Sequence, residues 1–216
     1  MLDLLLRRAL APGLDAAAAR LDRAGLGPAQ VTAAGFAVGA GACVAAGFGL
    51  WGLAGGLFLA NRALDGLDGP LARRRGVTDR GGFIDIVADF AVYGGFVLGV
   101  AAAEPDARLA CVALLLSYYV SGTAFLAWSS LAERRAIATG DERSLRFVGG
   151  LAEGTETTIA YLLFCLFPGA AATIAWAFAG VVGVTALQRV TFAARSLRPA
   201  AAAPRAAAAP RSERGR

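Results

Sequence analysis

Residues 61–90, NRALDGLDGPLARRRGVTDRGGFIDIVADF, carry clustered acidic side chains inside a chain that is otherwise rich in apolar residues. Asp65 and Asp68 are three positions apart, and Asp85 and Asp89 are four positions apart. Both spacings place the paired carboxylates on one face of a helix. A short arginine-rich turn between the two pairs predicts that the helices run antiparallel as neighbours. The four carboxylates are therefore expected to converge at one depth.

The composition of the chain favours a membrane protein built from helices. Of its 216 residues, 57% are hydrophobic and only 17% are charged, which is too apolar for an ordinary soluble domain of this size. An alternating strand pattern is absent, so we expect an all-α bundle and not a barrel. The net charge of +5 is interpreted as arginines near anionic membrane lipid, with no nucleic acid as a partner.

Six transmembrane helices are predicted, preceded by an interfacial amphipathic helix over residues 1–27. Together they form one membrane domain, 1–196, followed by a disordered cytoplasmic Ala/Pro/Arg tail, 197–216. The very short turns at 49–51 and 168–170 predict helical hairpins. The predicted spans are 31–49, 51–72, 80–103, 108–130, 148–168 and 170–193.

All 21 basic residues are arginines, and their distribution predicts the orientation of the chain. With the N-terminus inside, the external connections contain only Arg108, Arg62 and Arg189 fall within predicted spans, and the other arginines lie on the inner side. Cytoplasmic loops of membrane proteins carry such an excess of basic residues. We therefore expect both termini and the acidic cluster on the cytoplasmic side.

Four carboxylates in a poorly hydrated place would repel one another unless cations neutralise them. The chain has no histidine, so a hard metal must be held by oxygen, which suits Mg²⁺ or Mn²⁺. Small residues along the same helical stripes, Gly69, Ala72 and Gly81, predict close approach of the two backbones. Arg73 can add a charge-assisted contact to a phosphate. Asp79, in the turn, is interpreted as a residue that caps a helix or pairs with an arginine.

The pattern Asp65-x₂-Asp68-Gly69-x₂-Ala72-Arg73-x₇-Gly81-x₃-Asp85-x₃-Asp89 resembles the signature of the CDP-alcohol phosphatidyltransferases. The seven residues between Arg73 and Gly81 are one fewer than the more usual spacing in that family. The resemblance implies transfer of a phosphatidyl (substituted phosphoryl) group from a CDP-linked lipid, commonly CDP-diacylglycerol, to an alcohol with release of CMP. It also implies a role in phospholipid biosynthesis, a bacterial inner (cytoplasmic) membrane location and a homodimer.

The same resemblance assigns roles to individual residues. It implies that Asp65, Asp68, Asp85 and Asp89 ligate two metal ions, Mg²⁺ or Mn²⁺, and that Asp89 is also the general base on the acceptor hydroxyl. Residues implied to contact the donor are Gly69, Arg73, Thr78 and Thr32.

A second polar group lies near the predicted fifth span, where Glu153 and Glu156 are three positions apart. They either favour a helix N-terminus through its dipole or bind the acceptor. Arg143 and Arg146 either receive a phosphorylated acceptor or follow the topology rule. Arg189 lies inside the sixth span and must be paired or hydrated, which makes it a further candidate for acceptor binding.

Two alternatives to an enzyme remain at this point. A cation-coupled transporter would use intramembrane acids, but it would not require Gly69, Ala72 and Arg73 at fixed offsets, and repeated halves are not found. A catalytically silent membrane scaffold of the same fold would not need all four aspartates. The alcohol acceptor is left open among inositol phosphate, glycerol phosphate, serine and phosphatidylglycerol.

Overall fold

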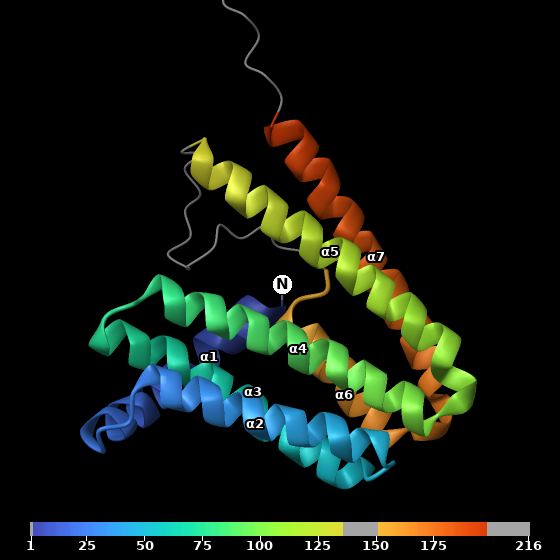
Figure 1. The fold of residues 1–216 in the computed structure, drawn as a ribbon, viewed down its shortest axis with the longest axis horizontal. Coiled ribbons are helices and arrows are strands. Elements are labelled where there is room, and N and C mark those ends of the chain that lie inside the picture. Colours follow the sequence, from blue (N-terminus) through green and yellow to red (C-terminus); the bar gives the residue numbers. More distant parts are fainter. Residues whose placement is uncertain (1, 136–150, 198–216) are drawn as a thin grey trace, which may run out of the picture.

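The computed structural model describes residues 2–135 and 151–197, and within this part every regular element is a helix (Figure 1). Of the predicted tail, 197–216, residues 198–216 lie outside the described residues. The α-helices are α1 (Leu2–Arg23), α2 (Pro28–Gly47), α3 (Trp51–Arg75), α4 (Asp79–Ala103), α5 (Arg108–Arg134), α6 (Gly154–Leu166) and α7 (Ala171–Ser196), with short 3₁₀ turns η1 (Pro105–Ala107) and η2 (Pro168–Ala170).

Each predicted span coincides with a helix, and the boundaries agree to within a few residues except at α6. That helix was expected from residue 148, but residues 151–153 are not helical and α6 begins at Gly154. The chain turns at both predicted places, and α2 and α3 pack along each other as a hairpin. The second hairpin is not formed, because α7 packs along α5 and makes few contacts with α6. Gly49, between α2 and α3, has φ +69°, a left-handed conformation that glycine adopts without steric cost.

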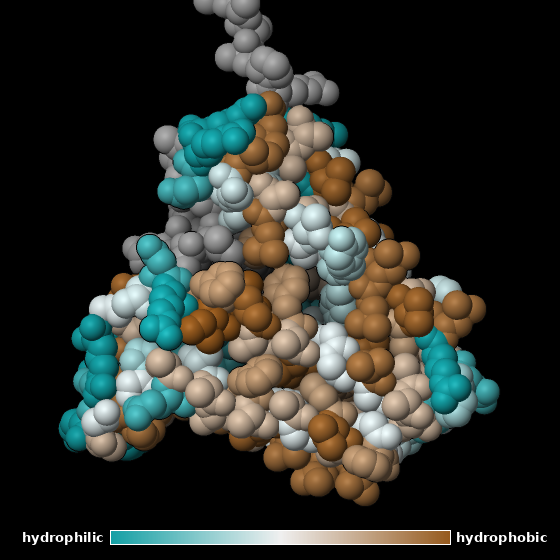
Figure 2. Space-filling model, in the orientation of Figure 1, coloured by the Kyte–Doolittle hydropathy of each residue, from teal (hydrophilic) through white to brown (hydrophobic). Residues whose placement is uncertain are grey.

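Four stretches of the described chain are long and apolar enough to cross a membrane: Pro28–Gly47, Asp79–Ala103, Pro105–Arg134 and Pro168–Ser196. Of the other two predicted spans, α3 carries charged side chains along its second half, and α6 is apolar but has only 13 residues. Large apolar side chains such as Leu98, Leu109 and Leu187 are more than half exposed. Figure 2 shows apolar side chains along the middle of the helices and hydrophilic ones gathered near the ends, as expected for a protein surrounded by lipid.

The helices form two arms that meet where α4 is followed by α5 and α6 is followed by α7 (Figure 1). In one arm, α2 packs against both α3 and α4, and in the other α5 packs along α7 (Figure 1). An aromatic group joins α3, α4 and α6: the ring of Phe96 lies 5.2 Å from Phe58 and 4.7 Å from Tyr161, between ring centroids. The Tyr161 hydroxyl donates a hydrogen bond to the backbone oxygen of Tyr93 at 2.7 Å. This buried group fixes the relative position of the helices that carry the acidic residues.

The N-terminal helix α1 is fastened to the charged end of α3. Ala18 packs with Val31 and Leu71 in a small buried cluster. Arg75 donates to the Asp22 carboxylate at 2.7 Å and to the backbone oxygens of Asp22 and Gly25. The predicted N-terminal helix is therefore present, and its placement at the membrane interface stays a prediction.

The predicted close approach of α3 and α4 through small residues is wrong. A Cβ atom built on Gly69 or Gly81 meets only side chains of the adjoining sequence, Arg73 and Thr78 respectively. The close backbone contacts are instead between α2 and α4. A Cβ on Gly99 of α4 would lie 2.5 Å from the backbone oxygen of Cys43. The α2 helix, which packs against both α3 and α4, therefore positions the backbones that carry the acidic residues.

We expect Gly99→Ala to destabilise the protein, because its methyl group would push α4 away from the α2 backbone. Overpacking of this kind costs about 1–3 kcal/mol. The matched control is Gly180→Ala, since a Cβ at Gly180 meets open space and alanine favours a helix over glycine by about 0.5–1 kcal/mol. Thermal unfolding in detergent should show a lower Tm for Gly99→Ala and an unchanged or higher Tm for Gly180→Ala. Equal Tm values for the two variants would contradict the proposed α2–α4 contact.

Candidate active site

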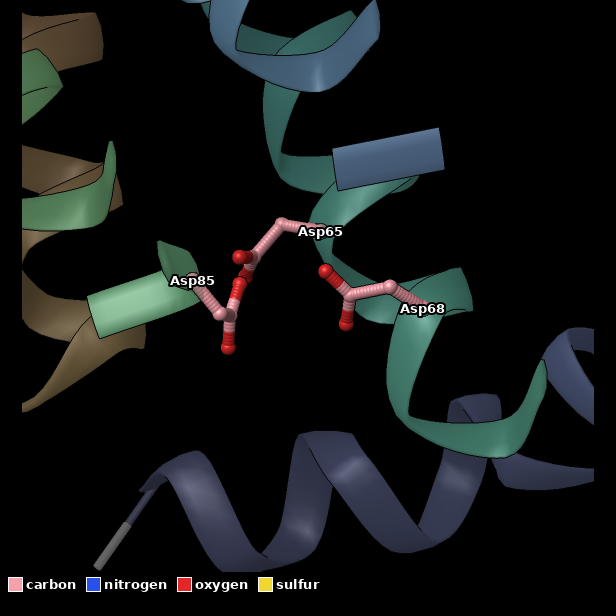
Figure 3. Close-up of side chains that lie close together, drawn as sticks. All are labelled: Asp65, Asp68 and Asp85. Atoms are coloured by element: carbon pink, nitrogen blue, oxygen red, sulfur yellow. The ribbon is translucent and has the colours of Figure 1, made fainter. Parts of the chain in front are cut away.

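Three carboxylates converge between the second half of α3 and the first half of α4 (Figure 3). Asp65 and Asp68 come from α3 and Asp85 comes from α4, and one oxygen atom of each lies within 4.8 Å of the others. All three side chains are half-buried. Figure 3 shows them pointing toward one another. The convergence predicted from the two helical spacings is confirmed for these residues.

This group fits a hard divalent cation. An octahedral Mg²⁺ site holds its oxygen ligands at about 2.1 Å, which puts opposite oxygens about 4.2 Å apart. One oxygen of each of Asp65, Asp68 and Asp85 lies within 4.8 Å of the others, so small side-chain adjustments suffice for shared ligation. The donor set is carboxylate oxygen alone, which suits Mg²⁺ or Mn²⁺ better than a soft metal.

Asp89 lies in the same pocket but is held differently, because its Oδ1 accepts a hydrogen bond from Arg62 Nη2 at 2.7 Å. Arg62 Nη1 lies 3.4 Å from Asp65 Oδ2. One guanidinium group therefore connects a carboxylate of α3 with a carboxylate of α4. The Arg62 side chain is only 13% exposed, so this bridge is largely shielded from water.

The wall of the pocket is contributed by α2. Thr32 donates a hydrogen bond to Asp68 Oδ2 at 3.2 Å, and its hydroxyl is also 3.1 Å from the backbone oxygen of Pro28. The structure thus places Thr32 beside the acidic cluster. Its contact with the donor, which the family resemblance implies, stays a prediction. The pocket is lined by Thr32, Gly35, Phe36, Asn61, Asp65, Asp68, Asp85, Ala88, Asp89 and Val92.

The other predicted donor contacts lie outside this pocket lining. Arg73 is exposed, and its Nη2 is 4.0 Å from Asp15 of α1. Gly69 lies one turn before it on α3. Thr78 is the N-cap residue of α4, and its hydroxyl accepts a hydrogen bond from the backbone N–H of Gly81 at 3.1 Å. The geometry therefore explains Thr78 as a helix cap, and its contact with a donor stays a prediction.

The predicted acceptor residues are only partly described. Glu153 and Glu156 form a capping box at the start of α6, where the Glu153 backbone N–H donates to Glu156 Oε2 at 3.2 Å. This geometry accounts for both acids at a helix N-terminus. In α7, Arg189 Nη1 donates to the hydroxyl and the backbone oxygen of Ser121 in α5, at 2.9 and 3.3 Å. Arg143 and Arg146 lie outside the described residues.

Two polar residues of the site were not predicted, Asn61 and Tyr93. Asn61 Oδ1 accepts two hydrogen bonds from Arg62, and the Tyr93 hydroxyl lies 2.7 Å from Arg62 Nη1. A signal for both was present in the sequence. Asn61 precedes Asp65 by four positions and Tyr93 follows Asp89 by four, so each shares a helical face with an acidic residue.

Comparisons with known proteins agree with this geometry. Residues 26–190 match the family model for CDP-alcohol phosphatidyltransferases. The chain is also 41% identical over 193 residues to the inner membrane protein YnjF of Escherichia coli strain K12. That similarity covers 88% of this chain and 94% of YnjF.

The fold is shared with solved structures of the phosphatidylinositol phosphate synthase PgsA1 of Mycobacterium tuberculosis. The structure with CDP-DAG bound superposes with a TM-score of 0.67 at 22% identity, over 83% of this chain and 92% of PgsA1. The structure in complex with manganese and citrate gives a TM-score of 0.69 at 21% identity, over 87% of this chain and 93% of PgsA1.

We expect Asp85→Asn to weaken binding of Mn²⁺ by at least roughly tenfold, since even residues that only support a metal ligand typically cost 10–100-fold when changed. Electron paramagnetic resonance of free Mn²⁺, titrated into the protein in detergent, measures this affinity. Asp79→Asn is the matched control, because Asp79 lies in the first turn of the same helix but outside the carboxylate group. If Asp79→Asn and Asp85→Asn weakened binding equally, the three carboxylates would not be the metal site.

Proposed function

The chain belongs to the CDP-alcohol phosphatidyltransferase family, and we propose that it transfers a phosphatidyl group from CDP-diacylglycerol to an alcohol, with release of CMP. The observation that carries this proposal is the convergence of Asp65, Asp68 and Asp85 at the positions of the family signature. The CDP-lipid donor is supported by the PgsA1 structure with CDP-DAG bound. The reaction would be a step of phospholipid biosynthesis.

Asp65, Asp68 and Asp85 are proposed to hold two divalent ions, Mg²⁺ or Mn²⁺, with Asp89 completing the ligand set. The PgsA1 complex with manganese supports this choice of metal. When bound, such ions supply neutralisation of the donor pyrophosphate and of the charge that develops on the leaving CMP. The Thr32 hydroxyl, which donates to Asp68 Oδ2, limits the orientations that this carboxylate can take.

The donor is proposed to lie across the charged end of α3. Arg73 is exposed there, and its 4.0 Å pairing with Asp15 is weak enough to be exchanged for a phosphate. Gly69, one turn earlier, leaves room for close approach of the donor to the helix backbone. Thr32 on the pocket wall and Thr78 at the start of α4 complete the proposed donor contacts.

Asp89 is the proposed general base. With no histidine in the chain, a carboxylate beside the metal site is the side chain best placed to take the proton of the acceptor hydroxyl. The acceptor oxygen forms a bond to the donor phosphorus, the bond from phosphorus to the CMP oxygen breaks, and the proton passes to Asp89. Because Asp89 Oδ1 is engaged by Arg62, the other carboxylate oxygen is assigned to the proton.

The acceptor is proposed to enter from the side of α6 and α7. Glu153 and Glu156 at the start of α6 and Arg189 in α7 are the described residues assigned to it, with Arg143 and Arg146 assigned from the sequence alone. Arg189 is the strongest of these, because a guanidinium inside an apolar helix is rare without a functional partner. A phosphorylated small alcohol is the acceptor class that such arginines suit.

In the membrane, α2–α7 are proposed to form six spans, with α1 at the interface, so that 1–196 is the membrane domain and 197–216 a disordered tail. The arginine distribution supports a cytoplasmic location for both termini and for the active site. The inner membrane location is supported by the name of the relative YnjF. The homodimer implied by the family resemblance is part of the same proposal.

The test is release of CMP from CDP-diacylglycerol by the purified protein in detergent, with Mg²⁺ and a panel of alcohols. We expect acceptor-dependent release, lost on removal of the metal with a chelator. Asp89→Asn should lower turnover by about 10²–10⁴-fold, the usual contribution of a general base, while donor binding changes only a few-fold.

Asp106→Asn is the control for this measurement, because Asp106 lies in η1, in the connection between α4 and α5 far along the chain from the signature. It should keep the turnover of the unchanged protein. If the protein releases no CMP with any acceptor, although a thermal unfolding transition shows that it is folded, the proposed activity is contradicted. Near-normal turnover of Asp89→Asn would remove the general-base role alone.

A further inference from the structure

Arg62 is a charged residue, largely shielded from water, that lies outside the signature and has no assigned role in the reaction. Its guanidinium makes five hydrogen bonds, to Asn61, Tyr93, Asp65 and Asp89. It also lies 4.8 Å from the Tyr93 ring centroid and 5.6 Å from that of Phe58. Stacking of this kind favours a cation over an aromatic face. The guanidinium is thus held by hydrogen bonds along its edges and by aromatic rings over its plane.

Asn61, which accepts two hydrogen bonds from Arg62, is itself held in place. Asn61 is 3% exposed, and its Nδ2 donates to the backbone oxygen of Gly35 in α2 at 2.9 Å. A Cβ on Gly39, the next turn of α2, would lie 2.8 Å from Asn61 Nδ2, so the amide has little room to turn. Its Oδ1 faces Arg62 and accepts hydrogen bonds from both Nε and Nη2 of that side chain. The position of the guanidinium is therefore fixed from α2.

The opposite edge of the guanidinium meets the acidic cluster. Nη2 holds Asp89 of α4 at 2.7 Å, and Nη1 is 3.4 Å from Asp65 of α3. These two helices share few close backbone contacts, and each packs instead against α2. The distance and orientation between the two carboxylates therefore depend on the side chain that joins them. A lysine could supply the charge but not the planar fork that reaches both acids and Asn61 at once.

We propose that Arg62 is a positioning residue with two separable effects, one of geometry and one of charge. Its planar fork holds Asp89 at a fixed place relative to Asp65, which turnover requires. Its positive charge opposes the approach of divalent cations, so the site binds them less tightly than its carboxylates alone would. The effect on turnover rests on the proposed function, whereas the effect on cation binding does not.

The two effects predict opposite consequences for one substitution. Arg62→Gln removes the charge and the bridge, so turnover should fall by roughly tenfold or more. The affinity for Mn²⁺ in the absence of substrate should rise, on the order of tenfold, because a like charge beside the site is gone. Arg62→Lys keeps the charge and loses the fork. It should bind Mn²⁺ as the unchanged protein does and still lose most of its turnover.

The experiment measures CMP release and, separately, free Mn²⁺ by electron paramagnetic resonance, for each variant in detergent. Tyr93→Phe is a third variant that keeps the aromatic ring and removes one hydrogen bond to Arg62. It should lower turnover only a few-fold and leave Mn²⁺ affinity unchanged. Arg108→Gln is the matched control, since Arg108, at the start of α5, donates to the backbone oxygen of Ala101 near the end of α4, and its substitution should change neither measurement.

A residue that only supported the fold would lower turnover and Mn²⁺ affinity together. The proposal is overturned if Arg62→Gln binds Mn²⁺ more weakly than the unchanged protein, or if Arg62→Lys keeps full turnover. If Arg62→Gln does not fold, Arg62→Lys and Tyr93→Phe decide the geometric effect. If the unchanged protein releases no CMP, the proposed function fails, and the Mn²⁺ titration still tests the effect of the charge.

Discussion

Repulsion among carboxylates at the junction of α3 and α4 is the constraint on which the site depends. Asp65, Asp68 and Asp85 lie together, and Asp89 is joined to them through Arg62. In a half-buried place, one guanidinium cannot neutralise four like charges. The remaining negative charge is a reason to bind divalent cations there, and it explains why these acids face the interior and not lipid.

The rest of the fold holds these acids at the right separation. The α2 helix packs against both α3 and α4 and meets α4 so closely that Gly99 has no room for a side chain. The rings of Phe58, Phe96 and Tyr161 fix α3, α4 and α6 deeper in the bundle. At the charged end, Arg75 fastens α1 to α3. The acidic cluster is thus surrounded by packed elements, and its own two helices meet through side chains, Arg62 with Asp89 and Phe58 with Phe96.

Much of this arrangement could be predicted from the sequence because it depends on local spacing. Acids three and four positions apart predicted the shared faces, and apolar runs predicted the helices. The packing partner could not be predicted this way. Gly69 and Gly81 have the spacing of a close helix contact, but only the tertiary structure shows that α3 and α4 pack their backbones against α2. The early start expected for α6 had a local cause. The apolar residues before Glu153 suggested a longer helix, whereas the helix begins at the capping box that Glu153 forms with Glu156. A helix N-terminus at these acids was one of the two alternatives that their spacing had left open. The Arg62 bridge needed both kinds of information, since Asn61 is a neighbour in sequence but is anchored to Gly35 of another helix.

The central claim is that Asp65, Asp68 and Asp85 form a divalent metal site that acts on a CDP-linked lipid. It is tested most directly by a crystal structure of the protein with Mn²⁺ and CDP-diacylglycerol, with anomalous diffraction recorded at the manganese absorption edge. We expect anomalous peaks within bonding distance of these three carboxylates and of the donor pyrophosphate. Manganese bound elsewhere, or a donor pyrophosphate that lies away from the three carboxylates, would contradict the claim.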